Sequence, residues 1–101
     1  MCWPVITEAA WLLRNDVGGS DRLFELLSSP AFAVVPLDEA ALAWVGTFVH
    51  RYSSARAQVA DAATMYLVHR FDAEAVFTLD RRDFTIFRTT DGRGLRLLPE
   101  A

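Results

Sequence analysis

The segment at residues 75–84, AVFTLDRRDF, constrains the fold of this chain more than any other. Residues 75–79 carry almost no polarity, and the run ends abruptly at Asp80, which two arginines, a second acid and an aromatic residue follow. An apolar run this short, bounded by charge, is typical of a strand buried on both faces of a parallel sheet. Ligands of open α/β sheets bind beyond the carboxyl ends of the strands, so Asp80 lies where such a fold has its chemistry.

The pattern in the remaining sequence indicates an α/β chain. Apolar residues recur at helical spacing in four segments, whose ends are marked by proline, serine, aspartate and glycine. These segments predict helices at residues 4–14, 21–29, 39–52 and 62–70, with Ser20 or Asp21, then Asp38, then Asp61 at the starts of the last three. Short β-branched or aromatic runs predict strands at residues 31–35, 75–79, 85–88 and 95–98, the last two around a turn at residues 91–94. Helices that alternate with buried strands are typical of α/β folds.

The composition excludes several classes of protein. A chain of 101 residues holds one domain at most. Its net charge of −3 gives no overall basic surface, so a nucleic-acid site must be a local patch. The single cysteine excludes an internal disulfide framework and fits a reducing cytoplasm. We expect neither a signal peptide nor a membrane span, because no apolar run is long enough for a span.

Glu8, Asp61 and Asp80 are the candidate functional carboxylates. The helical neighbours of Glu8 are all apolar, so none of them can pair with it. Each acid also has a plain structural interpretation. Glu8 could reach water from a helix edge, Asp61 could be a helix N-cap, and Asp80 could cap a short helical turn at residues 81–84.

Chain geometry brings two of these acids together. A helix from Asp61 to Arg70 is about 15 Å long, and a tight turn near residue 72 would return the chain antiparallel into the strand that ends at Asp80. Asp61 and Asp80 should therefore lie at the same edge of the sheet. Neighbouring carboxylates repel each other unless a cation neutralises them, and hard ions such as Mg²⁺ or Mn²⁺ prefer oxygen ligands.

With these residues in view, the chain resembles the PIN domain family, and in particular the bacterial VapC-like toxins. The matching pieces are PVITEAAWLLR around Glu8, ADAATMYLVHRFDAEAVFTLDRRDF around Asp61 and Asp80, and the ending GRGLRLLPEA. The resemblance covers essentially the whole chain. It implies a ribonuclease site that uses Mg²⁺ or Mn²⁺, with Glu8, Asp61 and Asp80 as catalytic and metal-binding acids and Asp83 as a less constant additional acid.

The resemblance also implies the fold and the partners. The fold would be a three-layer α/β arrangement with a parallel sheet, formed by one partial PIN-like domain at residues 1–101. The partners would be an RNA substrate, a small antitoxin and a second copy of the chain. The family's usual first, central strand and the aspartate at its end have no counterpart in this sequence. A misplaced gene start, a degenerate relic and a strand supplied by a partner all remain open explanations.

Two further features have both a functional and a structural interpretation. Arg81 and Arg82 could hold RNA phosphates at the mouth of the acidic site, or they could balance Asp80 and Asp83. Trp44, Phe48 and Tyr52 widen the apolar stripe of their helix, which could serve the core or a dimer or antitoxin surface. The functional hypotheses are therefore an RNA-cleaving toxin, a catalytically inactive PIN module that only dimerises or binds an antitoxin, and a structural α/β fragment without activity.

Overall fold

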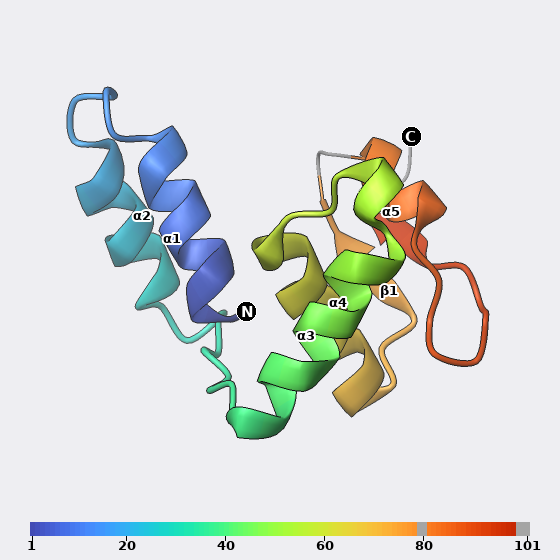
Figure 1. Ribbon diagram of the computed structural model, residues 1–101. Coiled ribbons are helices and arrows are strands. Elements are labelled where there is room, and N and C mark those ends of the chain that lie inside the picture. Colours follow the sequence, from blue (N-terminus) through green and yellow to red (C-terminus); the bar gives the residue numbers. More distant parts are fainter. Residues whose placement is uncertain (79–80, 99–101) are drawn as a thin grey trace.

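A computed structural model describes residues 1–78 and 81–98, with Arg81 described by its backbone alone (Figure 1). Six helical segments and two strands lie in these ranges. In chain order they are α1 (Trp3–Leu12), α2 (Gly19–Leu27), α3 (Glu39–Arg51), the 3-10 turn η1 (Ser53–Ala55), α4 (Val59–Phe71), β1 (Ala75–Phe77), α5 (Arg81–Ile86) and β2 (Arg96–Leu98). No helix within the described ranges is long and apolar enough to cross a membrane.

The first two helices form an antiparallel hairpin (Figure 1). Pro4 lies in the first turn of α1, where its missing N–H is no loss. The connecting loop ends at Gly18, whose φ of 72° lies in the left-handed region that glycine adopts without strain. An ion pair of 2.9 Å between Arg22 and Asp16 ties α2 to that loop. Gly18, and not Ser20 or Asp21, is therefore the N-cap of α2, and the predicted cap is wrong.

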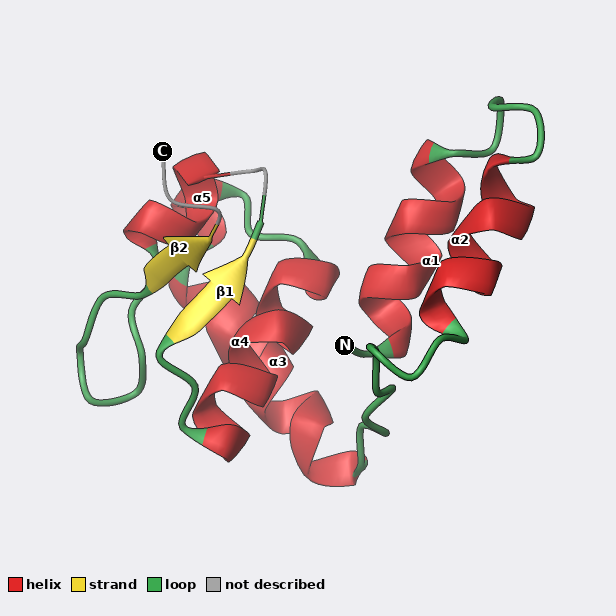
Figure 2. Cartoon of the chain, turned by 180° about the vertical axis from the view of Figure 1, so that it is seen from behind, coloured by secondary structure: helices red, strands yellow, loops and turns green. Residues whose placement is uncertain are grey.

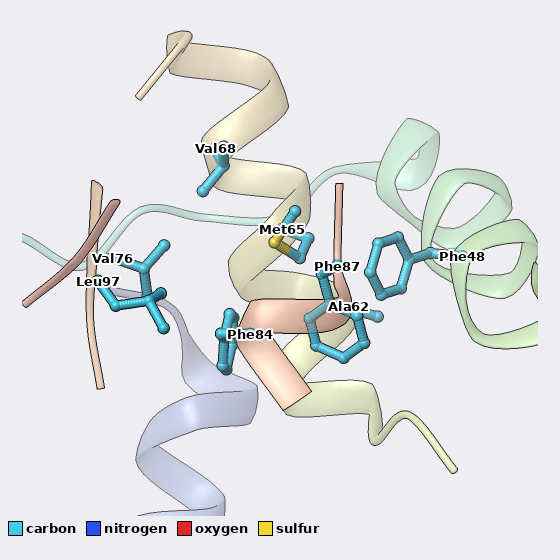
Figure 3. Close-up of a cluster of buried hydrophobic side chains, with 8 residues drawn as sticks. All are labelled: Phe48, Ala62, Met65, Val68, Val76, Phe84, Phe87 and Leu97. Carbon is cyan, nitrogen blue, oxygen red and sulfur yellow. The ribbon is translucent and has the colours of Figure 1, made fainter. Parts of the chain in front are cut away.

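The second half of the chain contains the sheet and most of the core. β1 and β2 pair in parallel, with Val76 opposite Leu97, and Figure 2 shows this two-stranded sheet beside α3, α4 and α5. The fold is thus a mixed helix and strand arrangement with a small parallel sheet, as the sequence predicted. The core cluster drawn in Figure 3 consists of Phe48, Ala62, Met65, Val68, Val76, Phe84, Phe87 and Leu97.

Helix α4 is the element that joins the two halves. Six of its 13 residues are buried, five of them within the predicted helix at residues 62–70, and it packs against α3 on one side and α1 on the other. The prediction of a mostly buried fourth helix is confirmed. Through this packing, α1 is brought to the N-terminal end of α4, which is where the candidate acids of both helices lie.

Two predicted strands are wrong. Residues 31–38, all of them described, form an extended loop in which Phe32 and Val34 are exposed. The backbone of this loop donates hydrogen bonds from the Val35 N–H to the Met1 carbonyl at 2.8 Å and from the Phe32 N–H to the Ser29 carbonyl at 3.2 Å, and these two bonds do not make a sheet ladder. Residues 85–88 continue the α5 turn, because Phe84 and Phe87 reach the core at helical spacing and the Phe87 N–H bonds to the Asp83 carbonyl.

The strand at residues 75–79 is confirmed over Ala75–Phe77, and Leu79 lies outside the described residues. Its predicted burial on both faces is wrong for the described part. Val76 is 8% exposed and packs into the core, whereas Phe77 on the opposite face is 73% exposed. The sheet therefore has one covered face at β1.

The aromatic stripe of α3 belongs to the core. Phe48 is buried, and Trp44 and Tyr52 are partly buried against the core cluster. The ring centroids of Phe48 lie 5.4 Å from Trp44 and 4.6 Å from Tyr52. The Tyr52 hydroxyl also accepts a hydrogen bond of 3.0 Å from the Arg88 N–H, which ties α3 to the segment after α5.

Candidate functional site

A polar depression of about 480 Å³ lies where α1, η1, the start of α4 and α5 come together. It contains three of the acids singled out in the sequence, although they lie on three separate helices. We call this depression the acidic pocket. Its lining residues are Glu8, Ser54, Ala55, Arg56, Gln58, Asp61, Arg82, Asp83 and Ile86.

Glu8 reaches the acidic pocket from α1. It is exposed, as the plain interpretation of a helix-edge glutamate requires, and it also lines the pocket, as the functional interpretation requires. The packing of α1 against α4 explains its position, because this contact brings the middle of α1 to the N-terminus of α4. Residues more than 50 positions apart thereby share one surface.

Asp61 lies in the first turn of α4 and is partly buried. The helix begins at Val59 with Gln58 as its N-cap, so the prediction that Asp61 itself is the N-cap is wrong. Its Oδ2 accepts a hydrogen bond of 3.3 Å from the Gln58 N–H, which is the return half of a capping box. This bond fixes the carboxylate at a helix N-terminus, where the backbone dipole favours negative charge.

Asp83 lies in the first turn of α5 and is partly buried. Its position follows from the short helix itself, which Phe84 and Phe87 anchor to the core. Asp80 and Leu79 lie outside the described residues, and so does the side chain of Arg81. The structure thus brings Glu8, Asp61, Asp83 and Arg82 to one pocket, and the predicted proximity of Asp61 to Asp80 remains a prediction.

The acidic pocket fits a hard divalent ion in the chemistry of its donors, which are carboxylates. Within residues 1–78 and 81–98, however, no three acidic, histidine or cysteine side chains are close enough together to hold a metal ion. Glu8, Asp61 and Asp83 share the pocket without forming such a cluster. Any ligand set built from them needs a further donor, and Asp80, directly before α5, is the acid predicted for that role.

Two arginines line the same pocket as these acids. Arg82 was predicted from the sequence, whereas Arg56 was missed. Arg56 follows η1 and precedes α4, and it lines the acidic pocket with an exposed side chain. The signal that could have revealed it is its place in the short loop before Asp61, because that loop must lie at the same edge as the N-terminus of the helix it precedes.

Comparison with known proteins adds a relative. No family model matches the chain. The chain is 29% identical over 97 residues to the ribonuclease VapC26 of Mycobacterium tuberculosis (strain ATCC 25618 / H37Rv), a match that covers 94% of the chain and 72% of VapC26. The chain is therefore similar to a VapC ribonuclease over nearly its whole length. The resemblance to VapC-like PIN proteins that was drawn from its sequence is confirmed by this relative.

Proposed function

We propose that this VapC-like chain is the toxin subunit of a type II toxin–antitoxin system and hydrolyses RNA phosphodiesters as an endoribonuclease dependent on Mg²⁺ or Mn²⁺. The observation that carries the proposal is the acidic pocket, in which carboxylates from α1, α4 and α5 lie beside arginine side chains. The similarity to a ribonuclease over nearly the whole chain supports it.

In this proposal Glu8, Asp61 and Asp80 are the catalytic acids and hold the divalent ion, with Asp83 as an additional acid. A bound ion of this kind lowers the pKa of a coordinated water and neutralises charge on the phosphoryl group. The chain itself contributes by holding the carboxylates in position. The capping bond from Gln58 orients the Asp61 carboxylate, and the exposed position of Glu8 leaves its carboxylate open to an incoming ligand.

The substrate is held by charge. We assign Arg81 and Arg82 to the RNA phosphates, because guanidinium groups bind phosphate oxygens through paired, charge-assisted hydrogen bonds. Arg82 lines the pocket that contains the acids, which supports this assignment for Arg82. The net charge of −3 makes such a local contact necessary, since the chain as a whole repels RNA.

The rest of the proposal concerns assembly. Residues 1–101 would form one partial PIN-like domain of three layers, without the family's first, central strand. The absence of that strand is supported by the sheet, because within the described residues β1 pairs with β2 alone and its other edge is open (Figure 2). The protein would act in the cytoplasm as a homodimer that a small antitoxin silences.

The test of the proposed activity is RNA cleavage by Glu8→Gln. The variant removes a carboxylate from an exposed side chain, so the fold should be kept while metal-dependent cleavage falls by about 100-fold or more. Cleavage of a structured RNA is measured with Mn²⁺, with Mg²⁺ and with EDTA. Glu25→Gln, the same exchange at an exposed site on α2, is the matched control and should cleave like the parent chain.

Two results would contradict the proposed activity. Cleavage by the parent chain that persists in EDTA would remove the metal from the mechanism. Cleavage by Glu8→Gln at the rate of Glu25→Gln would remove Glu8 from the site.

A second candidate function is an inactive PIN module that only dimerises or binds an antitoxin. It is favoured by the finding that the described acids alone make no metal-holding cluster. This candidate predicts no cleavage in any metal and no metal-dependent shift in the melting temperature, together with a stable complex with a small partner. A metal-dependent rise in melting temperature that Glu8→Gln abolishes would exclude it.

A further inference from the structure

The acidic pocket also contains two arginines whose side chains have no protein partner within the described residues. Most other described arginines are engaged. Arg14 donates to the Trp11 carbonyl at 2.8 Å, Arg22 pairs with Asp16 at 2.9 Å, and Arg93 pairs with Asp72 at 2.9 Å. Arg56 and Arg82, by contrast, line the pocket without a described side-chain bond or ion pair. Guanidinium groups left without a protein partner are free to bind an anion from solution.

Arg56 has an unusual backbone conformation. Its φ of 56° and ψ of 44° lie in the left-handed region, and Asp72 is the other described residue besides glycine with positive φ. A bulky residue is uncommon there. The position is held by the turn around it, because the Arg56 N–H bonds to the Ser53 carbonyl at 3.0 Å and the Ala57 N–H bonds to the Tyr52 carbonyl at 3.4 Å.

This turn links the arginine directly to the acids. Gln58, two residues after Arg56, caps α4 and donates to Asp61. Carboxylates gathered in one pocket repel a phosphate, so a substrate phosphate needs positive charge close beside them. Arg56 supplies this charge from the α4 side of the pocket, and Arg82 supplies it from the α5 side.

We infer that Arg56 binds a phosphate of the RNA backbone at the acidic pocket, as a substrate-binding residue distinct from Arg81 and Arg82. The inference rests on the ribonuclease function proposed above. It assigns a role to the left-handed turn, which places an arginine in the lining of the pocket that Asp61 also lines, at a position where glycine would fit the backbone better.

The test measures RNA binding apart from cleavage. A fluorescein-labelled single-stranded RNA is titrated into the chain that carries Glu8→Gln, in Mg²⁺ and over a range of salt concentrations. Adding Arg56→Ala should weaken binding by roughly ten-fold, the loss expected for a charge-assisted contact. It should also reduce the slope of log K against log salt by about 0.7, the value for one phosphate contact to a single strand.

Three companion variants separate binding from folding. Arg56→Gly should weaken binding as Arg56→Ala does, while its melting temperature stays equal to the parent's or rises, because glycine adopts the positive φ without strain. Arg56→Lys should restore most of the salt slope, since it restores the charge. Arg70→Ala removes an exposed arginine from the far end of α4, about 17 Å from the first residue of that helix at 1.5 Å per residue, and should bind like the chain without that substitution.

The outcomes distinguish this inference from the proposed function. Suppose that the unsubstituted chain cleaves RNA and that the Glu8→Gln chain binds it. If adding Arg56→Ala to the Glu8→Gln chain then changes binding no more than adding Arg70→Ala does, the role inferred for Arg56 is wrong and the proposed ribonuclease function stands. If loss of binding occurs only in variants that have also lost melting temperature, and Arg56→Gly binds normally, the arginine acts on folding alone. A parent chain that neither binds nor cleaves RNA overturns both proposals.

Discussion

At the scale of single residues, the candidate site could be predicted where an acid lacked a local partner. Glu8 was singled out because its helical neighbours are apolar, and the structure places it in the acidic pocket. Asp61 lies in the pocket as predicted but is not the N-cap of its helix, because α4 begins at Val59, three residues before the predicted start at residue 62. Arg56 could not be found in this way, because the signal for it is its place in the loop before Asp61 and not a missing local partner.

One residue-scale prediction concerns pH. The pKa of Asp91 lies below its ordinary value, first because the Thr89 hydroxyl donates to its carboxylate and then because Arg93 does, with its Nε 2.8 Å from the Asp91 Oδ2. A lowered folded-state pKa means that this carboxylate stabilises the fold above its unfolded pKa, near 4, and that the stabilisation is lost as the pH falls through the folded pKa.

Asp91→Asn should therefore lower the melting temperature at pH 7 and change it progressively less as the pH falls through the folded-state pKa, because the carboxylate then becomes protonated in the parent as well. Thermal melts of both chains at several pH values measure the difference. A gap in melting temperature that is the same at pH 7 and at pH 2 would show that the charge of Asp91 contributes nothing.

At the scale of elements, the helices could be predicted and half of the strands could not. A run of ten or more residues with apolar side chains at helical spacing predicts a helix without information from the rest of the chain, as the buried face of α4 illustrates. A short apolar run becomes a strand only if another strand lies beside it. Residues 75–77 found such a partner in β2, whereas residues 31–35 found none among the described strands and remained a loop.

The element-scale prediction concerns α5, the short helix that carries Asp83. Phe87 follows directly after it and is fully buried, with its ring edge-on to Phe48, Tyr52 and Phe84 at centroid distances of 5.0 to 5.2 Å. Phe87→Ala should lower the free energy of unfolding by about 3 to 5 kcal/mol, the usual cost of removing a buried aromatic side chain.

Phe71→Ala is the matched control, because Phe71 is 59% exposed at the end of α4 and should change the free energy of unfolding by less than about 1 kcal/mol. Urea unfolding curves, analysed with the same dependence of the free energy of unfolding on urea concentration, compare the two variants. Equal losses would mean that α5 is not anchored by the core. The position of Asp83 in the acidic pocket would then have no structural support.

At the scale of the whole molecule, the acidic pocket is the meeting point of three parts of the chain. The α1–α2 hairpin brings Glu8, α4 and the loop before it bring Asp61 and Arg56, and the segment after β1 brings Arg82 and Asp83. The antiparallel return of the α4 helix into the next strand predicted that the start of α4 and the segment after β1 lie at the same edge of the sheet. The docking of the hairpin depends on the packing of α1 against α4, and no local pattern contains that information.

A divalent ion that binds in the acidic pocket can be located without any substitution. Fe²⁺ is bound in place of Mg²⁺, and ascorbate with hydrogen peroxide then generates hydroxyl radicals that cut the backbone close to the ion. We expect cuts in three separate segments, around residue 8, around residues 56–61 and around residues 80–83, all suppressed by excess Mg²⁺. Cuts confined to other segments, or a pattern that excess Mg²⁺ leaves unchanged, would contradict the claim.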